Sequence, residues 1–232
     1  MAVRRSNSEA DKTPEPDIGA RLREERTRRG LSLRKLASIL GLSPSALSQI
    51  ETGRSRPSVS TLYAIVNELE ISFDDLFGTA QEWDRSGEEG DSDSITVRTM
   101  RHDPEDFVVR EDARQVIDLE SGVVWARLNP AGDPDVEFLE VTYDVGGSSS
   151  VGDTFMRHAG REYGTVLSGR LRVTVGFDTF ELEPGDSICF DSKVPHQLQT
   201  IGDEAVKAVW VVIGRSGSDR RAGWDDGPST RE

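Results

Sequence analysis

The segment GLSPSALSQIETGRSRPS, residues 41–58, decides how the N-terminal part of this 232-residue chain folds. Ser43 is a residue type that caps helix N-termini, and Pro44 suits the first helical position, where its missing N–H would have no intrahelical partner. Apolar residues then follow at helical spacing, at Ala46, Leu47 and Ile50. The preceding segment LSLRKLASIL stops at Gly41, a residue type favoured just after a helix. The stretch therefore predicts a helix, a tight glycine turn and a second helix.

Charge is divided unevenly along the chain. Residues 1–60 contain twelve Lys or Arg and seven Asp or Glu, a balance of +5, whereas the remainder contains sixteen and thirty-five, a balance of −19. The total of −14 thus conceals a basic segment, which is typical of a nucleic-acid-binding module joined to an acidic domain. The single cysteine excludes an internal disulfide, and no apolar run is long enough to cross a membrane. We therefore expect a soluble, cytoplasmic protein.

The pattern of apolar residues divides the chain into five parts. Residues 1–17 are polar and contain two prolines, which predicts a disordered arm, and residues 18–78 have the periodicity of four or five short helices. Residues 79–94 are acidic and rich in Gly and Ser, as in a linker. Residues 95–214 contain β-branched and alternating runs separated by Gly, Asp and Pro, which is typical of an antiparallel sandwich or barrel. The polar residues 215–232 predict a disordered tail.

The second helix of the predicted pair has one polar face. In a helix-turn-helix this helix packs against its domain and presents its other face to the DNA major groove. The presented side chains would be short or amide-bearing, namely Ser43, Ser45, Ser48, Gln49 and Thr52. Gln49 can pair with an adenine edge, and basic side chains near the two helices are placed to contact phosphates, namely Arg34, Lys35, Arg54 and Arg56. The alternative is a helical bundle whose polar face is merely solvated.

The residues from LSLRKLASIL to TLYAIVNELEIS resemble the XRE-type, phage-repressor-like helix-turn-helix family. They follow its order L-x-x-L-A, G-L-S-x-S-x-L-S-x-I-E-x-G-R-x-x-P-S and T-L-x-x-I-x-x-x-L, without a gap over about residues 18–77. The resemblance implies a double-stranded DNA operator as partner. It places Ser43, Ser45 and Gln49 at base-reading positions, and Ser48, Arg54 and Arg34 at phosphate-contacting ones. The chain departs from the family at residues 32–34, Ser-Leu-Arg, where several relatives begin this helix with a glutamine.

Two segments of the acidic part contain the remaining chemistry. HAGREYGTVLSGRLRVTV places His158 and Glu162 before a strand, and PGDSICFDSKVPHQLQT places His196 after a turn, so two imidazoles and a carboxylate could meet inside a small barrel. These segments resemble the two motifs of the cupin superfamily, which commonly binds a divalent metal through three histidines and one glutamate. His158, Glu162 and His196 match three of those ligands, but Met156 stands where the first histidine belongs. A thioether is a poor ligand for hard divalent ions.

Two interpretations of this site remain open: a metal held by His158, Glu162 and His196, or a metal-free pocket for a small charged effector. For the second, the candidate ligand-binding residues are Arg157, His158, Arg161, Glu162, Tyr163 and His196. The aromatic residues of this part are expected in its core, namely Trp125, Phe138, Tyr143, Phe155, Phe177, Phe180 and Trp210. Cys189, on an apolar strand, is expected to be buried.

The two resemblances imply a two-domain fold, an all-α helix-turn-helix domain of five short helices followed by an all-β cupin, a double-stranded β-helix or jelly-roll barrel. We expect a sequence-specific transcription regulator, a repressor, that dimerises through the cupin domain, binds a small-molecule effector and has no catalytic residues. The alternative is a metal-dependent cupin enzyme, a dioxygenase or isomerase, with an accessory DNA-binding domain. The DNA-reading motif is complete and the metal-binding motif is not, which favours the regulator.

Overall fold

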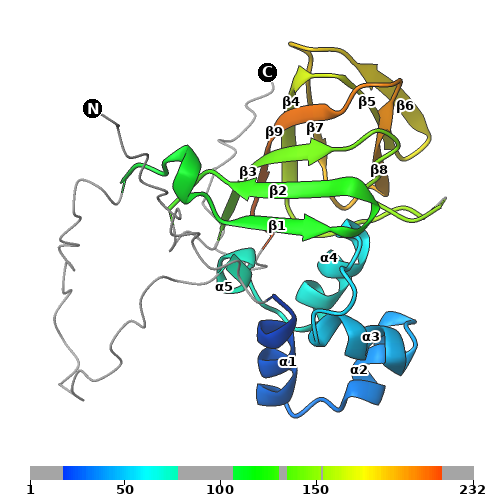
Figure 1. The fold of residues 1–232 in the computed structure, drawn as a ribbon. Helices are drawn as coiled ribbons and strands as arrows, with labels where there is room; N and C mark the ends of the chain where they lie inside the picture. Colours follow the sequence, from blue (N-terminus) through cyan, green and yellow to red (C-terminus); the bar gives the residue numbers. More distant parts are fainter. Residues whose placement is uncertain (1–17, 78–106, 131–134, 153, 216–232) are drawn as a thin grey trace, which may run out of the picture.

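A computed structural model of the protein describes residues 18–77, 107–130, 135–152 and 154–215 (Figure 1). This part of the chain begins with five helices and continues as a β-rich domain, so the predicted two-domain fold is confirmed. The predicted arm (1–17), the predicted linker (79–94) and residues 216–232 of the predicted tail lie outside the described residues. The helices are α1 (Ile18–Arg28), α2 (Leu33–Leu40), α3 (Pro44–Glu51), α4 (Val59–Glu68) and α5 (Phe73–Phe77).

Three of the helices begin at a serine cap. The side chains of Ser32, Ser43 and Ser58 accept a hydrogen bond from the backbone N–H three residues later, at 3.1 to 3.2 Å, so each satisfies one of the N–H groups that a helix start leaves unpaired. Gly41 ends α2 with φ 68°, in the left-handed region that favours glycine. The predicted helix, glycine turn and second helix are confirmed.

The β domain consists of two antiparallel sheets. One has six strands in the order β1-β2-β3-β9-β4-β7, and the other has three in the order β6-β5-β8. In chain order the strands are β1 (Val116–Leu119), β2 (Val123–Arg127), β3 (Val136–Tyr143), β4 (Arg161–Ser168), β5 (Arg170–Val175), β6 (Asp178–Leu182), β7 (Ser187–Asp191), β8 (His196–Ile201) and β9 (Val206–Ile213). Two 3-10 helices, η2 (Glu111–Ala113) and η3 (Glu120–Gly122), flank β1.

The prediction of the β core was only partly right. Trp125, Tyr143 and Trp210 are buried as expected, but the other four aromatics are exposed, namely Phe138, Phe155, Phe177 and Phe180. Cys189 is exposed too, because it pairs across the sheet with Tyr163 on the outer face. The inner face carries the row Glu137, Val212, Glu162 and Phe190, which lie opposite one another on β3, β9, β4 and β7.

The helical domain packs directly on the β domain. Figure 1 shows α4 and α5 against the β domain, with α1, α2 and α3 farther from it. Backbone hydrogen bonds join Ser60 N–H to the Ser149 carbonyl (3.1 Å) and Glu120 N–H to the Pro57 carbonyl (2.9 Å). Arg215, which the sequence analysis placed in a disordered tail, is buried in this contact, where its guanidinium lies 4.0 Å from the centre of the Phe73 ring. The two domains therefore share an interface, which the sequence did not predict.

Candidate functional site

Helix α3 exposes the side chains that the sequence predicted to face DNA. Ser43, Ser45, Gln49 and Thr52 are exposed and Ser48 is half-buried, while Leu47 and Ile50 of the same helix are buried against the helical core. The Ser43 hydroxyl also caps the helix, and the Thr52 hydroxyl donates to the Ser48 carbonyl at 2.8 Å. The polar face is thus presented by an ordered, capped helix.

The predicted phosphate-contacting side chains fall into two groups. Arg34, Lys35 and Arg54 are exposed near the ends of α2 and α3. Arg56 is exposed as well, but its guanidinium lies 3.0 Å from the Asp118 carboxylate on β1 of the other domain. Arg56 therefore already has an anionic partner within the protein. The ion pairs among the described residues do not include Arg34, Lys35 or Arg54.

A buried ion pair, which the sequence analysis missed, fixes the end of α3. Arg26 of α1 donates from Nε and Nη2 to the two carboxylate oxygens of Glu51, at 2.6 and 2.9 Å. Its Nη1 donates to the Leu31 carbonyl at 2.7 Å. The side chains are only 11% and 4% exposed, so this two-pronged pair is held out of water and positions α3 on α1.

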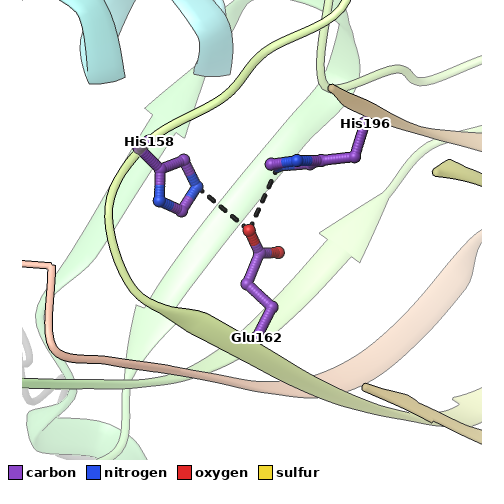
Figure 2. Close-up of side chains that lie close together, drawn as sticks. All are labelled: His158, Glu162 and His196. Atoms are coloured by element: carbon purple, nitrogen blue, oxygen red, sulfur yellow. Dashed lines mark ion pairs between the residues drawn. The ribbon is translucent and has the colours of Figure 1, made fainter. Parts of the chain in front are cut away.

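In the β domain, the three predicted metal-ligating residues converge. His158 lies in the segment before β4, Glu162 on β4 and His196 at the start of β8, and Figure 2 shows both rings pointing at one oxygen of Glu162. Glu162 Oε1 is 3.0 Å from His158 Nε2 and 3.1 Å from His196 Nε2. The three side chains are 0 to 2% exposed. We call this group the triad.

The hydrogen-bond geometry of the triad favours a cation at its centre. Each histidine Nδ1 lies 2.9 Å from a backbone carbonyl, of Ala159 for His158 and of Val194 for His196, so a neutral ring holds its proton on Nδ1. Both Nε2 atoms and Glu162 Oε1 then face one another as acceptors, and within the described part of the chain none of them has a hydrogen-bond donor. A proton on the imidazoles or a divalent cation removes this repulsion.

The donor set fits a divalent metal. The ligand atoms of His158, Glu162 and His196 lie within 4.8 Å of one another, and carbonyl-bound histidines are the usual orientation of metal-ligating imidazoles. Two histidines and one carboxylate suit a first-row metal and leave further coordination positions open. Met156 is buried, and its backbone pairs with His196, N–H to carbonyl in both directions at 3.0 and 2.9 Å. It therefore lies beside the triad, where the resemblance placed it.

Trp210 of β9 positions the carboxylate of the triad. Its indole N–H donates to Glu162 Oε2 at 2.7 Å, which leaves Oε1 for the histidines. Burial by itself raises the pKa of Glu162, but when His158 and His196 carry a proton on Nε2 their hydrogen bonds and charges outweigh burial and lower the pKa well below its usual range. The carboxylate therefore stays ionised, as a metal ligand must. Trp210 was predicted only as a core residue, and no local pattern in the sequence marks its contact with Glu162.

The structure does not bring the other predicted effector-binding residues to the triad. Arg161 and Tyr163 flank Glu162 on β4, and alternate residues of a strand point to opposite faces of the sheet. Both are exposed on the outer face, and Arg157, which precedes the buried His158, is exposed as well. Of the six predicted ligand-binding residues, only His158, Glu162 and His196 lie together.

The residues that do adjoin the triad come from distant parts of the chain. Tyr63 of α4 stacks on the His158 ring, with centroids 4.2 Å apart and planes at 2°. Its hydroxyl donates to Glu137 Oε2 at 3.1 Å, and Glu137 also forms an ion pair with Arg215. These three residues were not predicted, because nothing in the local sequence shows that α4 meets the barrel.

Comparison with known proteins identifies both parts of the chain. A helix-turn-helix family model matches residues 22–76, and a cupin domain family model matches residues 139–212. The chain is 28% identical to the HTH-type transcriptional regulator PuuR of Escherichia coli (strain K12) over 182 residues, which is 78% of this chain and 85% of that protein. It is 24% identical to the HTH-type transcriptional regulator SutR of the same organism, over 82% of this chain and 90% of that one.

A solved structure resembles the whole arrangement. The HTH_3 family transcriptional regulator from Vibrio cholerae superposes with a TM-score of 0.56 and 26% identity, covering 85% of this chain and 95% of that one. In the ranges that the structure describes here, no helix is both long and apolar enough to cross a membrane.

Proposed function

The chain combines an XRE-type helix-turn-helix domain with a cupin domain, and from this we propose that it is a sequence-specific DNA-binding transcription regulator, a repressor. The observation that carries the proposal is the exposed polar face of α3, which presents Gln49 and three hydroxyl-bearing residues. The basic side chains Arg34 and Arg54, which precede and follow these residues in the sequence, are exposed too. Its relatives PuuR and SutR bear the name of transcriptional regulators. The protein acts in the cytoplasm, where the DNA of a bacterial-type regulator is found.

We predict different effects for Gln49, on the exposed polar face of α3, and for Arg54, which follows α3. Gln49→Ala should lower affinity for the preferred duplex by about 1–3 kcal/mol and leave other sequences little affected, because an amide bidentate to adenine carries sequence information. Arg54→Ala should weaken binding to all duplexes alike and reduce the slope of log K against log salt by about 1, because it removes one phosphate contact. Anisotropy titrations against a duplex that the wild-type protein selects from a random pool measure both effects.

Arg172→Ala is the matched control, because it removes a partly exposed arginine of the β domain, where Arg172 on β5 is paired with Glu181 on β6. It should leave the affinity and the salt slope unchanged. Unchanged operator binding by both Gln49→Ala and Arg54→Ala would show that α3 does not read DNA in this way.

The cupin domain has the chemistry of a sensor in this proposal. The triad is buried, and its two histidines lie close to the Glu162 carboxylate. An effector that binds there changes operator affinity if it binds two states of the protein with different affinities. A bound metal would be held by His158, Glu162 and His196 and would act as a Lewis acid or as an anchor for a ligand. Catalysis demands more of the site, so we propose that the protein is not an enzyme. Stoichiometric metal together with oxygen consumption would instead support the alternative, a metal-dependent dioxygenase.

The triad variants Glu162→Ala and His196→Ala should abolish the response of DNA binding to effector and leave effector-free binding nearly intact. Each removes one of three donors, so the affinity for Co²⁺ alone should fall by more than the roughly 10- to 100-fold that loss of an outer-shell partner costs. Cobalt absorption titrations measure this, and Glu181→Ala, which removes an exposed carboxylate of β6, serves as the control. If both triad variants kept the wild-type response, the triad would not be the sensing site.

We also propose that the protein is a homodimer through its cupin domain. A single helix-turn-helix buries too little DNA surface for a tight selective site, so two half-sites about 34–36 Å apart, or a multiple, are expected. The outer face of the six-stranded sheet exposes an apolar row in which Phe138, Val211, Tyr163 and Cys189 lie opposite one another. Such a row offers apolar surface to a second copy of the chain.

Light scattering should therefore give twice the 25.6 kDa of the chain at micromolar concentration. Tyr163→Lys should yield monomers, because it places a charge in the apolar row. Phe177→Lys, at a fully exposed ring in the turn after β5, should not change the mass. A monomeric wild-type protein would exclude this assembly.

A further inference from the structure

An aromatic cluster fills the contact between the two domains. Tyr63 of α4 meets Phe73 of α5 at 5.1 Å and Trp125 of β2 at 5.7 Å, both edge to face, and Phe73 meets Trp125 at 5.3 Å. The other side of Tyr63 stacks on the His158 imidazole at 4.2 Å. The DNA-binding domain therefore touches a triad residue directly, ring against ring.

Polar contacts hold the Tyr63 ring in this orientation. Its hydroxyl donates to Glu137, which is also ion-paired with Arg215, and the Arg215 guanidinium lies over the Tyr63 ring at 5.1 Å from its centre. Burial, followed by the nearby Glu137 carboxylate, raises the pKa of Tyr63 well above its ordinary value, so the hydroxyl remains a donor. The ring is thus held by a hydrogen bond at its hydroxyl and by contacts with His158 and Arg215.

The triad is closed to solvent in this arrangement. Its three side chains are 0 to 2% exposed, and Tyr63, itself 4% exposed, covers the face of His158. The sheets that surround the triad are held by continuous backbone ladders, whereas the helical domain is attached by side-chain packing, ion pairs and isolated backbone hydrogen bonds such as that from Ser60 to Ser149. Local opening follows the weakest contacts, so the helical side is the side that opens.

We propose that helix α4 is a removable wall of the triad site, and that Tyr63 is the positioning residue that couples effector binding to undocking of the DNA-binding domain. This rests on the proposed function. A ligand larger than a single ion must displace the Tyr63 ring to reach the triad, so it binds the undocked state more tightly and shifts the protein towards that state.

The helical domain would undock as one body. Leu62, Ile65 and Val66 of α4 and Leu47 of α3 are fully buried in a hydrophobic core that continues into the β domain through Trp125. If the helices separate from the β domain as one body, α4 carries the α3 helix with it. In a dimer, such a movement changes the separation of the two α3 helices and thereby the fit to two half-sites. The triad can in this way control operator affinity without any change within the reading face.

The test uses the full-length protein without effector and compares Tyr63→Leu with Tyr63→Phe. Tyr63→Leu removes the ring but retains apolar volume, whereas Tyr63→Phe retains the stack on His158. Diethyl pyrocarbonate modification of His158, followed by mass spectrometry, reports whether the triad is covered. Amide exchange at Ser60 reports docking, because this first-turn N–H has no intrahelical acceptor and donates to Ser149 across the interface.

In Tyr63→Leu, the rate of His158 modification and the rate of Ser60 amide exchange should each rise by about tenfold. Several aromatic contacts are lost, and each contributes severalfold. Operator affinity should differ from that of the wild type by about fivefold or more, the lower end of typical allosteric coupling. Tyr63→Phe keeps the stack on His158 and loses only the bond to Glu137, so it should change all three measurements by much less than Tyr63→Leu does. Asn67→Ala, on the exposed side of α4, should match the wild type.

Two outcomes would overturn the proposal. Unchanged modification of His158 and exchange of Ser60 in Tyr63→Leu would show that α4 does not close the site. Increased rates with unchanged operator affinity would show that closure and DNA binding are not coupled. Both differ from failure of the proposed function, in which the wild-type protein would bind no duplex selectively although Tyr63→Leu still uncovered His158.

Discussion

Replacing Glu51 with alanine should destabilise the helical domain by about 3–5 kcal/mol, because it leaves the Arg26 guanidinium buried without its anionic partner. The two side chains are joined by two short hydrogen bonds, and Arg26 is only 11% exposed. Because a domain's total stability is about 5–15 kcal/mol, a loss of this size removes a large share of that stability, and at the lower end of the range it also lowers the folded population and with it DNA binding. Urea denaturation followed by the helical circular dichroism signal measures the change.

The matched control for this prediction is Glu181→Ala, which breaks an arginine pair of similar length on the surface of the β domain. It should cost no more than about 1 kcal/mol, because exposed ion pairs contribute little. The double variant Arg26→Met with Glu51→Leu should recover most of the lost stability, since apolar side chains of similar volume can replace a buried pair. A loss below 1 kcal/mol in Glu51→Ala would mean that the pair does not hold α3 on α1.

Gly164→Ala is expected to destabilise the β domain strongly. A Cβ at this position would lie 1.9 to 2.4 Å from three atoms of the Trp210 ring, so the ring must move. Overpacking and the loss of the indole donor to Glu162 together should cost roughly 2–5 kcal/mol. The displaced carboxylate should also weaken binding of Co²⁺ to the triad. Thermal unfolding and cobalt titration measure the two effects.

Trp210→Leu separates the clash from other causes. In a Trp210→Leu background, Gly164→Ala should cost much less than it does alone, because the two sites are in contact and their effects are not additive. The neighbouring substitution Thr165→Val, on the half-exposed outer face, should change stability by less than about 0.5 kcal/mol. Equal costs of Gly164→Ala in both backgrounds would show that the ring of Trp210 is not the obstacle.

The sequence by itself determined the features that depend on neighbouring residues. Ser43, Pro44 and Gly41 specify the helix, turn and helix, because capping and left-handed backbone are local preferences. The resemblance to the cupin motifs identified His158, Glu162 and His196, which the structure brings together around Glu162 Oε1. The prediction that Arg161 and Tyr163 line the pocket was inconsistent with the two-residue repeat of a β-strand. Both are immediate neighbours of the inward-facing Glu162, so they face outward.

Only the tertiary structure decided which distant residues meet. Tyr63 and His158 are separated by the predicted linker and several strands, and no spacing rule relates α4 to the segment before β4. The same holds for Arg26 with Glu51 and for Trp210 with Glu162, whose contacts arise from packing between elements. The sequence pattern records which face of an element is apolar, but burial is non-directional, so it leaves open which other element covers that face. That choice placed the DNA-binding domain over the triad.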